Sequence, residues 1–212
     1  MKKLKLIALG IILITAIGCK DSTKKIDYQT TETKTTKGTY TVVNDSAKVS
    51  FTAYKTTDKA AVRGVFKKIT LTNTRQGETA LDALNGAQFS IPVNSLFTND
   101  ATGSRDPKIL KFFFGVLKNT EIISGEFKVA VDNTCSIEVL LNGKTATIPL
   151  QFSTNSDSSL SFDGVMNLEN WDALAAVASI NKACEALHTG KDGISKTWSE
   201  VAVHADVLLN KN

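Results

Sequence analysis

Few side chains of this 212-residue chain could do chemistry. It has two histidines, and it lacks the HExxH, CxxC, GxSxG, Walker and GxGxxG patterns that mark common metal, nucleophile and phosphate sites. Asp100 and Asp106 flank Arg105, but turn capping and a surface ion pair explain these residues as well as acid–base catalysis does. We therefore predict no catalytic residue, no metal site and no cofactor. An enzyme that acts at a membrane through Asp100, Arg105 or Asp106 is the minority hypothesis.

Both histidines are interpreted as structural residues. His188 falls near the end of a predicted helix, where the helix dipole favours an imidazolium. His204 falls in the middle of a predicted strand. It lies opposite the residues that we expect to point inward, which are Val201, Val203, Ala205 and Val207.

An apolar run near the N-terminus stops at Cys19. The segment starts with three lysines and continues with apolar residues 6–14, the order of a secretory signal, and the run is too short to span a bilayer. The four residues that end at Cys19, AIGC, resemble the lipobox of bacterial lipoproteins. This resemblance implies that Cys19 is acylated and becomes the first residue of the mature protein. An ordinary signal peptide with an incidental cysteine is the alternative.

Composition divides the chain into three parts: a signal peptide (1–18), a lipidated flexible tether (19–37) and one barrel domain (38–212). The tether is rich in threonine and lysine and has too few apolar groups to fold. The signal holds three of the 25 basic residues and no acid, so 22 basic side chains face 21 acidic ones after its removal. Such a balance offers no basic stripe for nucleic acid. We expect the protein in the cell envelope of a Gram-negative bacterium, held by its acyl anchor to the outer membrane rather than the inner one.

The remaining cysteines, Cys135 and Cys184, leave two alternatives open. An exported protein meets an oxidising environment, which favours a disulfide between them. Two buried free thiols that pack as small apolar groups are equally consistent with the sequence.

Alternating apolar residues predict an all-β fold beyond residue 38. The predicted strands are 39–44, 48–55, 60–72, 86–97, 120–132, 135–142, 145–153, 158–168 and 197–209. Asn142-Gly143 predicts a tight hairpin, and Gly64 inside a strand predicts a bulge, a sharp bend at a barrel corner or a close approach of the backbone. Two accessory helices are expected. The short one spans 107–114, with Asp106 as its cap, and the longer one spans about 170–188.

All ten phenylalanines fall between Phe51 and Phe162, one on nearly every predicted strand. A filled sandwich core explains them. So does an antiparallel lipocalin-like barrel of about eight strands, whose interior is wide enough for one ligand. In a hollow barrel we expect Phe113 to close one end of the lumen. The predicted lining residues are Phe51, Phe66, Phe89, Phe127 and Phe162.

Several segments resemble YceI-like domains. Residues 38–71 match the opening strands, with Val62, Gly64 and Phe66 in a Val-x-Gly-x-Phe pattern, and residues 91–115 match the central strand, Arg-Asp loop and short helix. ISGEF (123–127) fits the next strand, and the C-terminal NKACEALHTG with KTWSEVAVHADVLL fits a lipoprotein variant. Lys108 departs from the pattern, because a histidine often follows Arg-Asp in that family.

The resemblance implies an exported, non-enzymatic barrel that binds a long amphiphile. We therefore expect a lipid-anchored protein that holds a polyisoprenoid or a fatty-acid derivative in its lumen, with membrane contact through the acyl chains. A homodimer is an additional expectation. A structural or interaction lipoprotein with a filled core is the alternative function.

Overall fold

The computed structural model describes residues 39–212. Cys19 and the predicted signal peptide and tether lie outside the described residues, so their assignment stays a prediction. Among residues 39–212, no helix has the length and apolar character needed to cross a membrane.

The described chain forms one antiparallel sheet of eleven strands. In order along the sheet they run β4-β5-β7-β8-β9-β10-β11-β2-β3-β6, and β1 pairs with β11. The strands are β1 (Tyr40–Val42), β2 (Lys48–Lys55), β3 (Ala60–Phe66), β4 (Thr70–Thr72), β5 (Gln88–Pro92), β6 (Leu96–Phe97), β7 (Ile122–Val129), β8 (Cys135–Leu141), β9 (Lys144–Ser156), β10 (Ser159–Asn167) and β11 (Thr197–Lys211).

The sheet curls because one bent segment joins its two ends. β5 pairs with β7, and then the chain turns through the 3-10 helix η1 (Val93–Ser95) into β6, which pairs with β3. With β5 and β6 counted as one bent strand, and the three-residue strands β1 and β4 set aside, eight strands form the wall. The predicted antiparallel barrel of about eight strands is confirmed.

The hairpin between β8 and β9 follows from two residues. Asn142 and Gly143 have φ values of 54° and 71°, as a type I′ turn requires, and Leu141 pairs with Lys144 across the turn. The Asn142 side chain also donates to the Trp171 carbonyl at 2.8 Å, and Trp171 Nε1 donates to the Val139 carbonyl at 2.8 Å. These bonds tie the hairpin to the segment before the C-terminal helices.

The helices differ in part from the prediction. The short helix is α2 (Arg105–Phe112), followed by η2 (Phe114–Val116). The longer one is interrupted at Asp172, whose left-handed φ of 54° ends η3 (Leu168–Trp171), and again at Cys184 between α3 (Leu174–Ala183) and α4 (Glu185–His188). Apolar spacing alone did not reveal these two breaks, because Val177, Ile180 and Cys184 are still buried.

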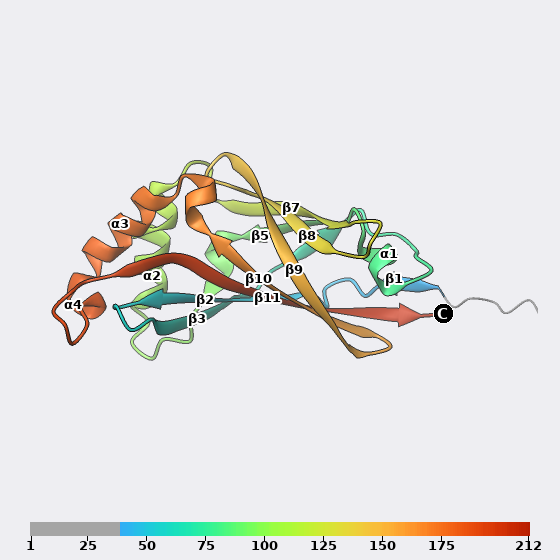
Figure 1. The fold of residues 1–212 in the computed structure, drawn as a ribbon, viewed down its shortest axis with the longest axis horizontal. Coiled ribbons are helices and arrows are strands. Elements are labelled where there is room, and N and C mark those ends of the chain that lie inside the picture. Colours follow the sequence, from blue (N-terminus) through green and yellow to red (C-terminus); the bar gives the residue numbers. More distant parts are fainter. Residues whose placement is uncertain (1–38) are drawn as a thin grey trace, which may run out of the picture. The chain divides into compact units, whose positions relative to one another are not determined.

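A further helix, α1 (Ala80–Leu84), has no counterpart among the predicted elements. It is too short to show helical periodicity. Its start carries a signal nevertheless, because Thr79 and Asp82 form a capping box. Figure 1 shows α1 and β1 at one end of the barrel and α2, α3 and α4 at the other.

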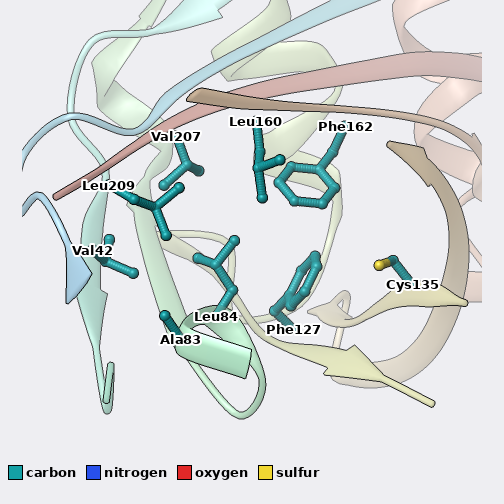
Figure 2. Close-up of a cluster of buried hydrophobic side chains, with 9 residues drawn as sticks. All are labelled: Val42, Ala83, Leu84, Phe127, Cys135, Leu160, Phe162, Val207 and Leu209. Carbon is teal, nitrogen blue, oxygen red and sulfur yellow. The ribbon is translucent and has the colours of Figure 1, made fainter. Parts of the chain in front are cut away.

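Buried side chains gather at both ends. Around Trp171, which is fully buried, the wall packs against η2, η3 and α3. At the opposite end nine buried residues from α1 and five strands point toward a common interior (Figure 2); they are Val42, Ala83, Leu84, Phe127, Cys135, Leu160, Phe162, Val207 and Leu209. We call this second cluster and its surroundings the α1 end.

Candidate ligand-binding lumen

The barrel encloses a cavity of about 530 Å³. Its volume falls within the usual range for small-molecule sites, and its lining is predominantly apolar, as such sites require. In most strands, alternate residues supply most of the lining. In β11 these are Val201, Val203, Ala205 and Val207, the four residues predicted to point inward.

All six phenylalanines predicted to contact a ligand line this cavity. Five come from different strands of the wall, and Phe113 lies at the end of α2, where its ring meets Phe114 edge-to-face at 5.0 Å between centroids. The other five are Phe51, Phe66, Phe89, Phe127 and Phe162. Their ligand contacts remain a prediction. Phe152 is 42% exposed and is absent from the lining, although it belongs to an alternating set.

Glycines opposite two of these rings keep the interior open. Phe51 pairs with Gly64 across β2 and β3, and a Cβ atom at Gly64 would lie 2.4 Å from Phe51 Cζ. Phe89 pairs with Gly125 across β5 and β7, where a Cβ atom would lie 2.4 Å from Phe89 Cζ and 2.1 Å from the Glu138 carbonyl oxygen. Each ring therefore lies against the wall over its glycine. The group that comes close to Gly64 is therefore a side chain, whereas the sequence predicted a bulge, a sharp bend or a close approach of the backbone.

Most of the polar residues of the lining come from one end of the barrel, which we call the polar end. They lie in the loop before α2, in α2 and α4, and at the adjoining ends of β2 and β11. The lining residues that carry charge or a hydroxyl there include Lys55, Asp100, Thr102, Ser104, Arg105, Lys108, His188 and Thr197.

Asp100 organises the loop that enters α2. Its carboxylate accepts hydrogen bonds from Thr102 Oγ1 at 2.6 Å and from the backbone N–H groups of Ser104 and Arg105 at 3.0 and 3.1 Å. Arg105 Nη2 lies 3.5 Å from Asp100 Oδ1. The bond from Thr102, together with the two backbone bonds and the Arg105 charge, lowers the pKa of the Asp100 carboxyl. This is the turn-capping and ion-pair arrangement expected for Asp100 and Arg105.

Asp106 has a different role from the predicted helix cap. The helix already includes Arg105, and Asp106 Oδ1 accepts from the backbone N–H and the hydroxyl of Thr98 at 3.1 and 2.5 Å. The prediction that Asp106 caps this helix is therefore wrong, since Asp106 binds the end of β6 to the first turn of α2.

His188 lies at the polar end, next to Lys55 and Thr197. Its Nδ1 lies 2.6 Å from Thr197 Oγ1, and Thr197 is the direct cross-strand partner of Lys55. Burial lowers the pKa of the His188 imidazole, and the positive charge of Lys55 lowers it further. His188 was predicted to be a structural residue at a helix end, where the dipole favours the charged form. The structure shows that burial and Lys55 act in the opposite direction.

His204 is on the outer face of the wall, opposite the inward residues as predicted. Its Nδ1 lies 2.7 Å from Asp163 Oδ1 on β10, and its Nε2 lies 3.3 Å from Asp206 Oδ1. The hydrogen bond with Asp163, aided by the charges of both carboxylates, raises the pKa of the His204 imidazole. Within residues 39–212, no cluster of three or more potential ligands is arranged to hold a metal ion.

Cys135 and Cys184 are both buried and both free. Cys135 belongs to the cluster at the α1 end, whereas Cys184 follows α3 and lines the cavity. Of the two alternatives left open by the sequence, the structure has the free thiols. Burial raises the pKa of the Cys135 thiol, which keeps it in the unreactive protonated form.

Lys55 lines the cavity, although it was not among the predicted lining residues. A usable signal was present, because Lys55 continues the alternation of Val49, Phe51 and Ala53 along β2, and all four line the cavity. A lysine that ends a series of inward-facing apolar residues is easily interpreted as a solvent-exposed residue beyond the end of the barrel.

Comparisons with known proteins match this fold but give no close relative. A polyisoprenoid binding domain from Saccharophagus degradans, implicated in plant cell wall breakdown, superposes with a TM-score of 0.57 at 12% identity, over 82% of this chain and 98% of that one. BcnA from Burkholderia cenocepacia superposes with a TM-score of 0.50 at 17% identity, over 80% of this chain and 99% of BcnA. A Campylobacter jejuni YceI protein gives a TM-score of 0.47 at 14% identity, over 72% of this chain and 86% of that one. No family model and no curated protein matches the chain. The first two superpositions show the fold, and they confirm the barrel that the YceI resemblance implied.

Proposed function

We propose that this chain, which shares its fold with a polyisoprenoid binding domain, holds one long-chain amphiphile in its lumen. A polyisoprenoid or a fatty-acid derivative fits the proposal, and no catalytic step is part of it. The observation that carries it is the apolar cavity of about 530 Å³, reached by inward residues of nearly every strand. A chain of methylenes gains about 0.8 kcal/mol for each one buried, so an apolar tube can bind it without reactive groups.

The cavity supports ligand binding over the filled-core alternative. A filled barrel would need large side chains that meet across the lumen. Instead, Gly64 and Gly125 let Phe51 and Phe89 lie against the wall, so two of the largest side chains leave the centre free.

Identification of the bound molecule tests the proposal. We expect native mass spectrometry of the purified protein to show added mass that organic solvent removes, and we expect the extract to contain a lipid with a long hydrocarbon chain. Protein that carries no such molecule, and that binds neither long-chain alcohols nor prenols when they are added, would contradict lipid binding.

We further propose that the domain is exported and anchored to the cell envelope through acylated Cys19. The apolar run, the small residues before Cys19 and the polar tether after it support this proposal. Metabolic labelling with palmitate should mark the wild type and a Cys135→Ala control, but not Cys19→Ala. Label that persists in Cys19→Ala would contradict the anchoring proposal. It would not affect the proposal that the lumen binds a lipid.

A further inference from the structure

Lys55 is a cation on the inward, otherwise apolar face of β2. The residues before it on that face of β2 are Val49, Phe51 and Ala53, and all four line the cavity. Lys55 is only partly exposed, and its ammonium has neither an ion pair nor a hydrogen bond with any residue in the range 39–212. A partly desolvated charge without a partner is costly, and a lipid whose head group carries the opposite charge would compensate it.

The neighbours of Lys55 form a chain of hydrogen bonds with a fixed direction. Asn181 Oδ1 accepts from Ser195 Oγ at 3.3 Å and from Thr197 Oγ1 at 2.9 Å. Because Thr197 has one hydroxyl proton and gives it to Asn181, Thr197 Oγ1 accepts from His188 Nδ1 at 2.6 Å. The neutral imidazole therefore carries its proton on Nδ1, which leaves Nε2 as an acceptor.

Lys55 and His188 thus offer complementary groups at one place. Lys55 pairs across the strands with Thr197, which holds the imidazole, and all three residues line the polar end of the lumen. The ammonium donates hydrogen bonds and carries charge, while Nε2 accepts a proton. An acidic oxygen head group meets both requirements, because it bears a negative charge and can share a proton.

We infer that Lys55 and His188 form a head-group site for a lipid that ends in an acidic oxygen group, a carboxylate or a phosphate. The hydrocarbon chain then extends from this site toward the α1 end, along the apolar lining. This inference rests on the proposed function, since it specifies the head of the lipid whose chain fills the lumen.

The binding of matched acids and alcohols tests the site. Dodecanoate is compared with dodecanol, and farnesyl phosphate with farnesol, by titration calorimetry on the purified domain after solvent extraction. A charge-assisted hydrogen bond should make an acid bind about tenfold to a hundredfold more tightly than the alcohol of the same chain. The pair with the larger preference distinguishes a carboxylate head from a phosphate head.

Lys55→Met is the decisive variant, because methionine keeps an unbranched apolar side chain and removes the charge. It should abolish the preference for the acid and weaken the binding of the acid far more than that of the alcohol. Lys48→Met is the matched control, since Lys48 is exposed at the start of the same strand and does not line the cavity. Equal losses for acids and alcohols in Lys55→Met would mean that Lys55 only supports the fold, and would overturn the inference.

The pH profile tests the part played by His188. Lys55 is the charged group that acts on this imidazole; the nearby Glu185 is ion-paired with Lys182, and Asp192 accepts from Thr57 and the Ile194 backbone. A bound anion offsets the Lys55 charge and raises the pKa of His188, so binding takes up a proton. Dodecanoate affinity should therefore rise as the pH falls from about 8 toward about 6.5, the ordinary pKa of histidine. In His188→Phe the affinity for dodecanoate should not change with pH over this range.

Three results separate the inference from the proposed function. A preference for acids that Lys55→Met removes and Lys48→Met keeps supports the head-group site. Equal binding of acids and alcohols by the wild type overturns the site and leaves lipid binding in place. Failure to bind any of the four compounds overturns both.

Discussion

The α1 end of the barrel and the middle of its lumen are built from the same kinds of residue and differ in how these pack. At the α1 end Phe127 and Phe162 meet edge-to-face at 5.0 Å, and both are almost completely buried. In the middle of the lumen Phe51 and Phe66 lie 5.7 Å apart at a tilt of 45°, and both stay half-buried against the cavity. Aromatic rings by themselves therefore do not decide whether a barrel is filled or hollow.

The difference comes from what lies opposite each ring. At the α1 end the helix α1 inserts Ala83 and Leu84 among the strand residues, which completes a close-packed cluster (Figure 2). Farther along, glycines stand opposite Phe51 and Phe89. One inserted helix and two cross-strand glycines account for a barrel that is packed at one end and open inside.

The largest expected effect comes from the same substitution made in both regions. Phe127→Ala should destabilise the fold by about 3–5 kcal/mol, because it leaves a new void in a packed cluster. Phe51→Ala should cost no more than about 2 kcal/mol, because its ring is only half-buried, whereas that of Phe127 is almost completely buried. Urea unfolding of both variants measures the difference. Equal costs would mean that the lumen is as well packed as the α1 end.

The next effect separates the two glycines of the lumen. Gly125→Ala should cost about 2–3 kcal/mol, since its Cβ would meet a backbone oxygen that cannot move away. Gly64→Ala should cost about 1 kcal/mol or less, since Phe51 can swing its ring into the cavity. Thermal unfolding tests both variants, and in Gly64→Ala the displaced ring should also weaken lipid binding. A larger cost at Gly64 than at Gly125 would argue against a free volume beside Phe51.

A smaller effect on stability, joined to a large effect on binding, is expected when the lumen is blocked. Ala53→Trp places an indole in the cavity and should cost less than about 1 kcal/mol, because no packed group must move. Lipid retained per protein should fall sharply. Thr52→Trp is the control, since Thr52 is the neighbouring β2 residue and faces the outside of the wall. Full retention of lipid in Ala53→Trp would place the ligand elsewhere.

The smallest effect extends the comparison from the inside of the wall to the outside. His204 has a raised pKa, so its ion pairs with Asp163 and Asp206 stabilise the fold below about pH 6.5, the ordinary value for histidine. That contribution is lost as the pH rises through the raised pKa. The stability difference between the wild type and His204→Gln should therefore shrink as the pH increases. A difference that grows with pH would contradict this sign. His188, with its lowered pKa, should show the opposite trend.

Much of the fold could be predicted from local patterns. Alternation located the strands, with most ends correct to within a few residues, and Asn142-Gly143 defined the β8–β9 hairpin. The predicted strands 60–72 and 86–97 are each divided, because a turn separates β3 from β4 and η1 bends the chain between β5 and β6. These divisions let one segment join both ends of the sheet, and strand periodicity carries no information about such a bend.

The candidate site could be predicted only in part. Successive side chains of a strand point to opposite faces of the sheet. This alternation correctly predicted that five phenylalanines face the same interior; they are Phe51, Phe66, Phe89, Phe127 and Phe162. Phe152 pairs directly with Phe162 and shares its face of the sheet, yet Phe152 is 42% exposed, since β9 extends past the packed part of the wall. The same alternation places Lys55 on the inward face. The role that we infer for Lys55 depends, however, on His188, which lies 133 positions farther along the chain.

The sequence by itself determined which face of each strand is apolar, where the tight hairpin forms and which common catalytic motifs are absent, since each depends on residues close together in the chain. Only the tertiary structure decided that the barrel is hollow, that Cys135 and Cys184 are apart, and that Lys55, Thr197 and His188 share one end of the lumen. The physical reason is that free volume and charge pairing depend on distances between segments remote in sequence. Those distances are set by strand order, by the bend between β5 and β6 and by the placement of the helices.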